Sequence, residues 1–124
     1  MEYKVLNNGL RMPMIGLGVY NISERETQRV VENAISIGYR SIDTAAMYYN
    51  EKGVGNAVRT CGVPREELFI TTKICDSCYT KEETLLTVDH SMKRLGLEKT
   101  QKTPLKEIAK AQEFRRLYFA NKKK

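Results

Sequence analysis

The segment GYRSIDTAAMYYNEKGVG, residues 38–55, contains the features from which the rest of the sequence can be interpreted. Residues 39–42 predict a short β-strand that ends at an acid, Asp43. A tyrosine, Tyr48, follows five residues later. Charged side chains are poor core residues. A carboxylate and a phenol at the end of a strand therefore have two interpretations: a turn or cap residue with an ordinary loop aromatic, or the groups of a functional site.

The residues before this segment predict a hairpin, a strand and a helix. Residues 3–6 and 10–12 flank an Asn-Gly pair, which is a strong hairpin signal. The apolar run at residues 15–19 suits a buried strand. Ser23 and Glu26 predict a capping box at the start of a helix. Its predicted inward face consists of Thr27, Val30, Val31, Ala34, Ile35 and Gly38.

Two more helices and a strand are predicted after the segment. A helix begins at Asn50 or Glu51 and turns Val54, Ala57 and Val58 inward. Residues 68–73 predict a strand that ends at Lys73. A third helix follows a second capping box, formed by Thr80 and Glu83, and ends at Gly96. Its predicted inward face consists of Leu85, Val88, Met92 and Leu95.

The order of these elements predicts an α/β fold. Strands that alternate with helices form crossover units and a parallel sheet. The strands begin near residues 15, 39 and 68, which is the spacing of a (β/α)8, or TIM, barrel. A complete barrel needs about 250 residues. The 124 residues therefore predict a partial TIM barrel with an N-terminal hairpin and about three βα units.

The C-terminal residues form a separate region. Residues 101–124 contain eight Lys or Arg and two Asp or Glu, which accounts for the whole net charge of +6. We expect residues 1–98 to form the barrel part and residues 99–124 a basic tail that is helical or partly disordered. A run of like charges such as this one is most often a solvated end of the chain. A small adaptor that binds polyanions through the tail is an alternative, but no recognition motif supports it, and we expect neither nucleic acid nor membrane as a partner.

The cellular setting is predicted from the first residues and from the cysteines. Residues 1–10 lack the charged and then apolar pattern of an export signal. The three cysteines are an odd number, which favours reduced thiols. We therefore expect a cytoplasmic protein.

Three side chains are candidates for catalysis. Asp43 and Lys73 end neighbouring parallel strands, so they are expected at the same edge of the sheet, where barrel enzymes place their chemistry. Tyr48 lies in the loop that leaves the Asp43 strand. A tyrosine has an ordinary pKa near 10, and a nearby ammonium lowers the pKa of a phenol. The three groups therefore predict a proton donor that works near neutral pH.

These motifs resemble the aldo-keto reductase family. GYRSIDTA, Glu51 and then Val54-Gly55 are similar to its first signature, and LNNGLRMPMIGLGVY, REELFITTKI and SMKRLGL resemble the segments around it. The resemblance covers residues 3 to about 98. It implies NADPH-dependent reduction of small aldehydes and ketones on a TIM barrel. It further implies that Tyr48 donates the proton, that Lys73 and Asp43 assist it, and that Gly18, Val19, Tyr20 and Asp43 contact the cofactor.

Two features implied by the resemblance have no counterpart. The family has a catalytic histidine after its fourth strand, but the single histidine here, His90, lies within the third predicted helix. The clamp for the adenosine phosphate belongs to the second half of the barrel, so the choice between NADPH and NADH stays open. The alternative function is a truncated, catalytically inactive remnant that self-associates or binds a partner through open barrel edges.

Other motifs have simpler interpretations. Cys75 and Cys78 have CxxC spacing, but no second pair completes a zinc site. Two loop thiols are the default interpretation, a thioredoxin-like pair is the alternative, and we expect no metal. Gly16 and Gly18 lack the third glycine of a Rossmann motif, and they predict close backbone approach instead. Tyr49 is interpreted as a packing residue and His90 as a residue of the helix surface.

Overall fold

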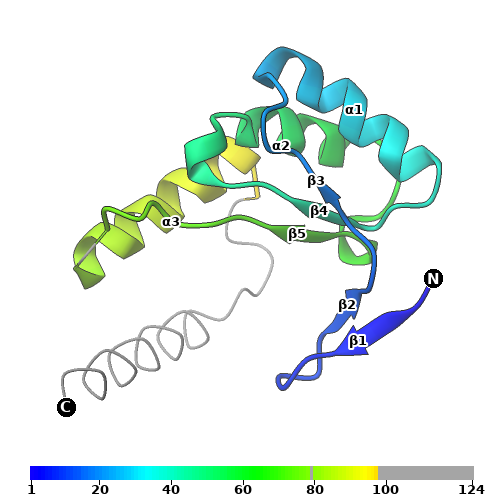
Figure 1. The fold of residues 1–124 in the computed structure, drawn as a ribbon, viewed down its shortest axis with the longest axis horizontal. Coiled ribbons are helices and arrows are strands. Elements are labelled where there is room, and N and C mark those ends of the chain that lie inside the picture. The colour runs from blue at the N-terminus through cyan, green and yellow to red at the C-terminus, as the bar shows by residue number, and fades with distance from the viewer. Residues whose placement is uncertain (79, 98–124) are drawn as a thin grey trace.

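The structure, a computed structural model, describes residues 1–78 and 80–97 (Figure 1). The tail predicted over residues 99–124 lies outside the described residues. The elements follow one another as β1 (Tyr3–Val5), β2 (Arg11–Pro13), β3 (Leu17–Gly18), α1 (Glu24–Ser36), β4 (Ser41–Asp43), the 3-10 helix η1 (Ala46–Tyr48), α2 (Glu51–Thr60), the 3-10 helix η2 (Arg65–Glu67), β5 (Phe69–Thr71) and α3 (Lys81–Leu95).

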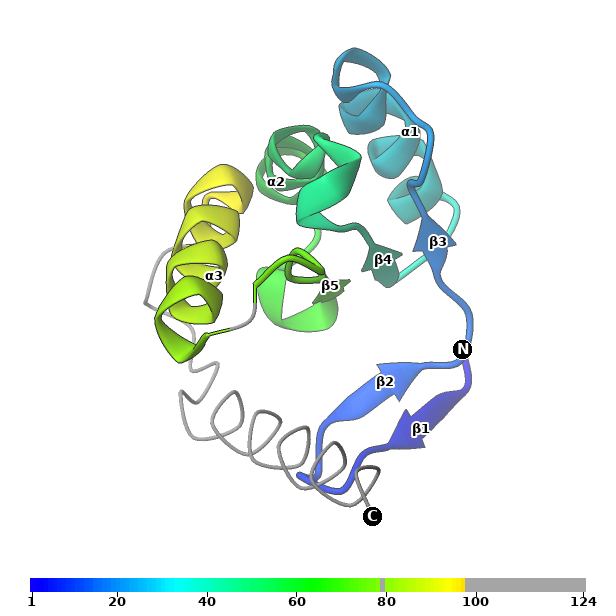
Figure 2. The same cartoon turned by 60° about the vertical axis from the view of Figure 1, so that its left-hand side comes forward.

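The sheet confirms the α/β fold and the partial barrel. Strands β3, β4 and β5 are parallel neighbours in sequence order. The register places Gly18, Asp43 and Thr71 side by side across the three strands. Helices α1, α2 and α3 follow one side of the sheet, and the antiparallel hairpin β1–β2 lies away from them (Figure 2). The described chain is thus a hairpin followed by three βα units.

The core lies between the sheet and the helices. It is one cluster of buried apolar side chains: Val19, Val31, Ile35, Ile42, Val54, Ala57, Val58, Leu68 and Leu95. Helices α1 and α2 contribute through the apolar stripes that their 3.6-residue periodicity predicts. Gly55 lets α3 approach α2 closely, because a Cβ at this position would lie 2.8 Å from the Cα of Leu95.

The strands are shorter than the sequence predicts. The run at residues 15–19 contributes only Leu17–Gly18 to the sheet, and Ile15 is 65% exposed. The strand predicted over residues 68–73 ends at Thr71, so Lys73 lies two residues beyond it. Both predictions extended the strands too far because an apolar or β-branched run shows where a strand passes but not where its pairing stops.

The helix starts agree with the sequence, but two details were wrong. At α1, Ser23 is the N-cap, yet its hydroxyl donates to the Glu26 carboxylate at 3.0 Å and caps no backbone N–H. At α3, by contrast, Thr80 and Glu83 form the complete capping box. On the inward face of α3, Leu95 is buried as predicted, but Val88 and Met92 are only half-buried and Leu85 is exposed, while Thr84 and Ser91 are buried instead.

Candidate active site

Asp43 and Lys73 meet at the carboxyl ends of β4 and β5. Asp43 is the last residue of β4. Beyond the strands the two chains stay joined, because the Thr44 amide donates to the Thr71 carbonyl at 2.8 Å and the Ala46 amide donates to the Lys73 carbonyl at 3.2 Å. These bonds fix the backbone of Lys73 beside the segment that carries Asp43.

The three predicted catalytic side chains come together at this edge. Lys73 Nζ lies 2.6 Å from Asp43 Oδ2 and donates to it in an ion pair. The same ammonium lies 3.3 Å from the hydroxyl oxygen of Tyr48, and it donates at 3.1 Å to the Thr44 carbonyl. The lysine therefore bridges the carboxylate and the phenol.

The surroundings keep Lys73 charged. Burial lowers the pKa of Lys73, but hydrogen bonds and charge interactions with Asp43 and Tyr48 outweigh this effect, so the pKa lies above its ordinary value of 10.5. The side chains of Lys73 and Asp43 are 47% and 43% exposed. The group at this edge is thus an accessible ammonium throughout the neutral pH range.

Tyr48 is held by a 3-10 turn and by a second aromatic ring. It ends η1, and its amide donates to the Ala45 carbonyl at 3.0 Å. Its ring packs against Tyr20, with ring centroids 5.0 Å apart. The prediction that Tyr49 is a packing residue was wrong, because Tyr49 has a φ of 54° and is 82% exposed. The left-handed backbone at this position turns its side chain to solvent.

Asn50, a residue without a predicted role, supports the site from beneath. It is fully buried. Its side-chain amide donates to the Val19 carbonyl at 2.8 Å and to the Ile22 carbonyl at 3.0 Å, and it accepts from the Thr44 hydroxyl at 2.7 Å. Asn50 therefore ties the loop after β3 to the residue that follows Asp43.

Glu51 forms a second buried connection that was also missed. It is 1% exposed, and its carboxylate accepts from the Thr72 hydroxyl and from Arg94 Nε, each at 2.6 Å. Thr72 immediately precedes Lys73, so this carboxylate links α2 and α3 to the site. A signal existed in the sequence, since Glu51 lies three and seven residues before Val54 and Val58 and thus on the buried face of α2.

The predicted cofactor residues surround the same edge. A Cβ added to Gly18 would meet no atom within 4 Å, so the backbone there is open. Tyr20 is 67% exposed. Val19 is fully buried, and its amide and carbonyl already bond to the Asp43 carbonyl and to Asn50. Open space thus lies over Gly18 and Tyr20, whereas Val19 serves packing.

The remaining candidate groups lie apart from these residues. His90 is exposed on α3, as predicted. Among residues 1–78 and 80–97 no cluster of three or more His, Cys, Asp or Glu could hold a metal ion. Within the same residues, none of the helices has the length and apolar character needed to cross a membrane.

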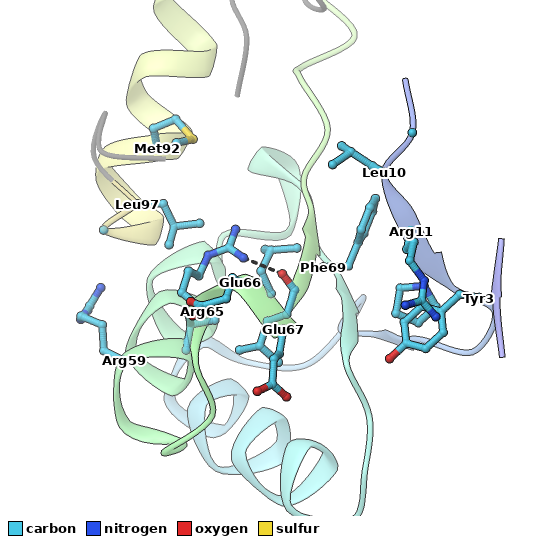
Figure 3. Close-up of a pocket in the computed structure, with 16 residues that line it drawn as sticks. Tyr3, Leu10, Arg11, Arg59, Arg65, Glu66, Glu67, Phe69, Met92 and Leu97 are labelled. Atoms are coloured by element: carbon cyan, nitrogen blue, oxygen red, sulfur yellow. Dashed lines mark hydrogen bonds between the residues drawn. The ribbon is translucent and has the colours of Figure 1, made fainter. Parts of the chain in front are cut away.

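A pocket of about 1010 Å³ lies at the N-terminal end of β5 (Figure 3). It is lined by the hairpin, by η2 and β5, and by the ends of α2 and α3. The residues that line it include Leu10, Arg65, Phe69 and Met92. None of Asp43, Tyr48 and Lys73 contributes to it. The pocket therefore borders β5 but not the candidate active site.

The sequence places this fold in a known family. Residues 14–103 match the Aldo/keto reductase family. Because the match covers more than half of the chain, the protein belongs to that family.

Individual relatives support the assignment. The chain is 50% identical over 93 residues to morphine 6-dehydrogenase of Pseudomonas putida, a match that covers 75% of this chain and 31% of that protein. An aldo/keto reductase of Brucella melitensis superposes with a TM-score of 0.74 at 43% identity, covering 77% and 36% of the two chains. The Bombyx mori aldo-keto reductase in complex with NADP superposes with a TM-score of 0.70 at 34% identity, covering 77% and 34%. The chain thus spans about a third of the length of these relatives.

Proposed function

We propose that the chain carries the proton-donor site of an NADPH-dependent reductase that converts aldehydes or ketones to alcohols. The observation that carries this proposal is the contact of Lys73 with both Asp43 and Tyr48, at 2.6 and 3.3 Å. The family match supports it, since named members of the family are oxidoreductases.

Tyr48 is the proposed proton donor. Its hydroxyl transfers a proton to the carbonyl oxygen of the substrate, and the ammonium of Lys73 stabilises the phenolate that remains. Asp43 holds the ammonium in place through the ion pair. The raised pKa of Lys73 supports this role, because the lysine stays charged while the tyrosine loses its proton.

The residues present fit a nicotinamide cofactor. Gly18 leaves its backbone open to a planar group, Asp43 lies beside Gly18 in the strand register with a half-exposed carboxylate, and Tyr20 follows two residues later with an exposed side chain. When bound, NADPH or NADH supplies the hydride that the carbonyl carbon receives. In this proposal Gly18, Val19, Tyr20 and Asp43 shape the nicotinamide end of the site, with Val19 acting only through packing.

A titration with NADPH tests the proposal. We expect saturable binding, followed by the fluorescence of the nicotinamide, and oxidation of the bound NADPH when a simple aldehyde is added. Gly18→Val should weaken binding because its side chain fills the open space. The same titration with NADH measures the preference between the cofactors. Absence of saturable binding by the folded chain would overturn the proposal.

Self-association is a second candidate, favoured by the edge of β5. Within the described residues β5 pairs with β4 on one side, and no described strand pairs with its other edge. An unpaired strand edge offers amides and carbonyls to another chain. In this alternative the chain is inactive by itself and associates with a second copy. Sedimentation that depends on concentration, without turnover, would support it, and a monomer at all concentrations would exclude it.

For the compartment we propose the cytoplasm. Cys61, Cys75 and Cys78 are all free thiols. Reduced cysteines are typical of proteins in a reducing compartment, where disulfides that do form are transient.

A further inference from the structure

The loop between β5 and α3 brings two cysteines together. Cys75 and Cys78 are the ends of a turn in which the Cys78 amide donates to the Cys75 carbonyl at 3.3 Å. A turn of this kind keeps its end Cα atoms within about 7 Å. Disulfides span roughly 4.4–6.8 Å between Cα atoms, so a turn of this kind is compatible with the spacing that a disulfide requires.

The two thiols differ in exposure and in surroundings. Cys75 is partly exposed, and its sulfur lies 2.6 Å from the Ser77 hydroxyl. Hydrogen bonds from the Ser77 hydroxyl, the Ser77 amide and the Cys78 thiol lower the pKa of Cys75. Cys78 is 7% exposed, and its sulfur contacts the Thr87 hydroxyl on α3 at 3.0 Å. The outer thiol is thus the more reactive one, and the inner thiol is shielded from reagents.

We propose that Cys75 and Cys78 form a reversible intramolecular disulfide, which makes this loop a site of thiol oxidation. The oxidant is a low-molecular-weight disulfide. The Cys75 thiolate attacks one of its sulfurs and releases the first small thiol. Cys78 then attacks the Cys75 sulfur of the mixed disulfide, and the second small thiol leaves with the Cys78 proton. Two protein thiols are oxidised, one external disulfide is reduced, and the inference is independent of carbonyl reduction.

Cys61 provides a matched control. It is also partly exposed, and its sulfur contacts only backbone carbonyls among the described contacts, those of Val58 and Val63 at 3.5 and 3.9 Å. Within residues 1–78 and 80–97 it has neither a hydroxyl at its sulfur nor a second cysteine in its turn. Cys61 should therefore behave as an ordinary half-buried thiol.

Oxidised glutathione is the probe for the test. With the wild-type chain we expect a product that has lost two hydrogen atoms, carries no glutathione, is mapped by proteolysis to Cys75–Cys78, and reverts with dithiothreitol. Cys78→Ser should instead accumulate glutathione on Cys75, and Cys75→Ser should react slowly. Cys61→Ser should behave as the wild type does.

The mapping on the wild-type chain decides the matter even if a variant fails to fold. A lasting glutathione adduct on the wild type would overturn the proposal, as would disulfides between chains. In a separate measurement, an alkylating reagent should modify Cys75 faster than Cys61. Equal rates at the two thiols would contradict the assignment of Cys75 as the attacking thiol.

Discussion

Replacement of Gly55 by Ala reverses the effect expected from helix propensity alone. Gly55 lies within α2, where alanine is favoured over glycine by about 1 kcal/mol. In the fold, however, the new Cβ would lie 2.6 Å from the carbonyl carbon of Leu95 and 2.8 Å from its Cα, and it would approach the carbonyl oxygen more closely still. These atoms belong to the backbone of α3, so no side-chain rotation relieves the overlap.

The magnitude follows from the two opposing effects. Overpacking costs about 1–3 kcal/mol, and a backbone neighbour favours the upper end of that range. After the gain in helix propensity we expect Gly55→Ala to lower the free energy of unfolding by about 2 kcal/mol.

Urea unfolding followed by far-ultraviolet circular dichroism measures this change, since the chain has no tryptophan. Gly53→Ala in the same helix is the comparison. Its Cβ would lie 2.9 Å from both the Glu24 carbonyl oxygen and Thr27 Cβ, a less severe overlap, so it should lower the free energy of unfolding by less. A Gly55→Ala chain that is more stable than the wild type would refute the close contact of α2 and α3.

Three further substitutions, one of them with a control, test the buried network and the ion pair. Arg94→Met removes the charged partner of the buried Glu51 carboxylate and should cost about 3 kcal/mol of unfolding free energy, the lower end for a broken buried pair because the Arg94 side chain is 43% exposed. The control, Lys93→Met, breaks an exposed ion pair in the same turn and should cost less than about 0.5 kcal/mol. Equal losses of stability in the two variants would contradict a buried ion pair at Glu51. Asn50→Ala leaves buried backbone groups without a side-chain partner and should cost about 1–3 kcal/mol in the same urea assay, so an unchanged midpoint would exclude its role. Because the folded-state pKa of Lys73 lies above 10.5, the stability lost in Lys73→Met should be constant from neutral pH to about 10.5 and should shrink as the pH rises further; a difference that grows above pH 10.5 would be the opposite of the expected sign.

Local chemistry explains which parts of the fold could be predicted from the sequence. The hairpin, the helix starts and the apolar stripes of α1 and α2 depend on residues near one another in the chain. The ends of strands do not depend on nearby residues in this way. Strand β5 ends at Thr71, although the next residue, Thr72, is also β-branched, and Lys73 lies two residues beyond the strand. Similarly, Ser23 has the sequence of a capping box but bonds to the Glu26 carboxylate instead of the backbone.

The candidate site also contains residues that could be predicted from the sequence and residues that could not. Asp43, Tyr48 and Lys73 could be predicted because parallel strands deliver their carboxyl ends to one edge. Asn50 and Glu51 were missed because a polar residue at a helix start is ordinarily interpreted as a cap or a solvated residue. Their burial depends on partners distant in sequence, such as Val19 and Arg94, which supply the hydrogen bonds that a buried polar group needs.

The measurement that tests the central claim most directly is the oxidation of NADPH by the purified chain in the presence of an aldehyde, compared between Tyr48→Phe and Tyr49→Phe. Both substitutions remove one hydroxyl from adjacent tyrosines, but only Tyr48 contacts Lys73, and Tyr49 is exposed. The account predicts at least a 100-fold loss of turnover, roughly the lower bound for a general acid, in Tyr48→Phe and a nearly unchanged rate in Tyr49→Phe. Turnover that survives in Tyr48→Phe would contradict the assignment of Tyr48 as the proton donor.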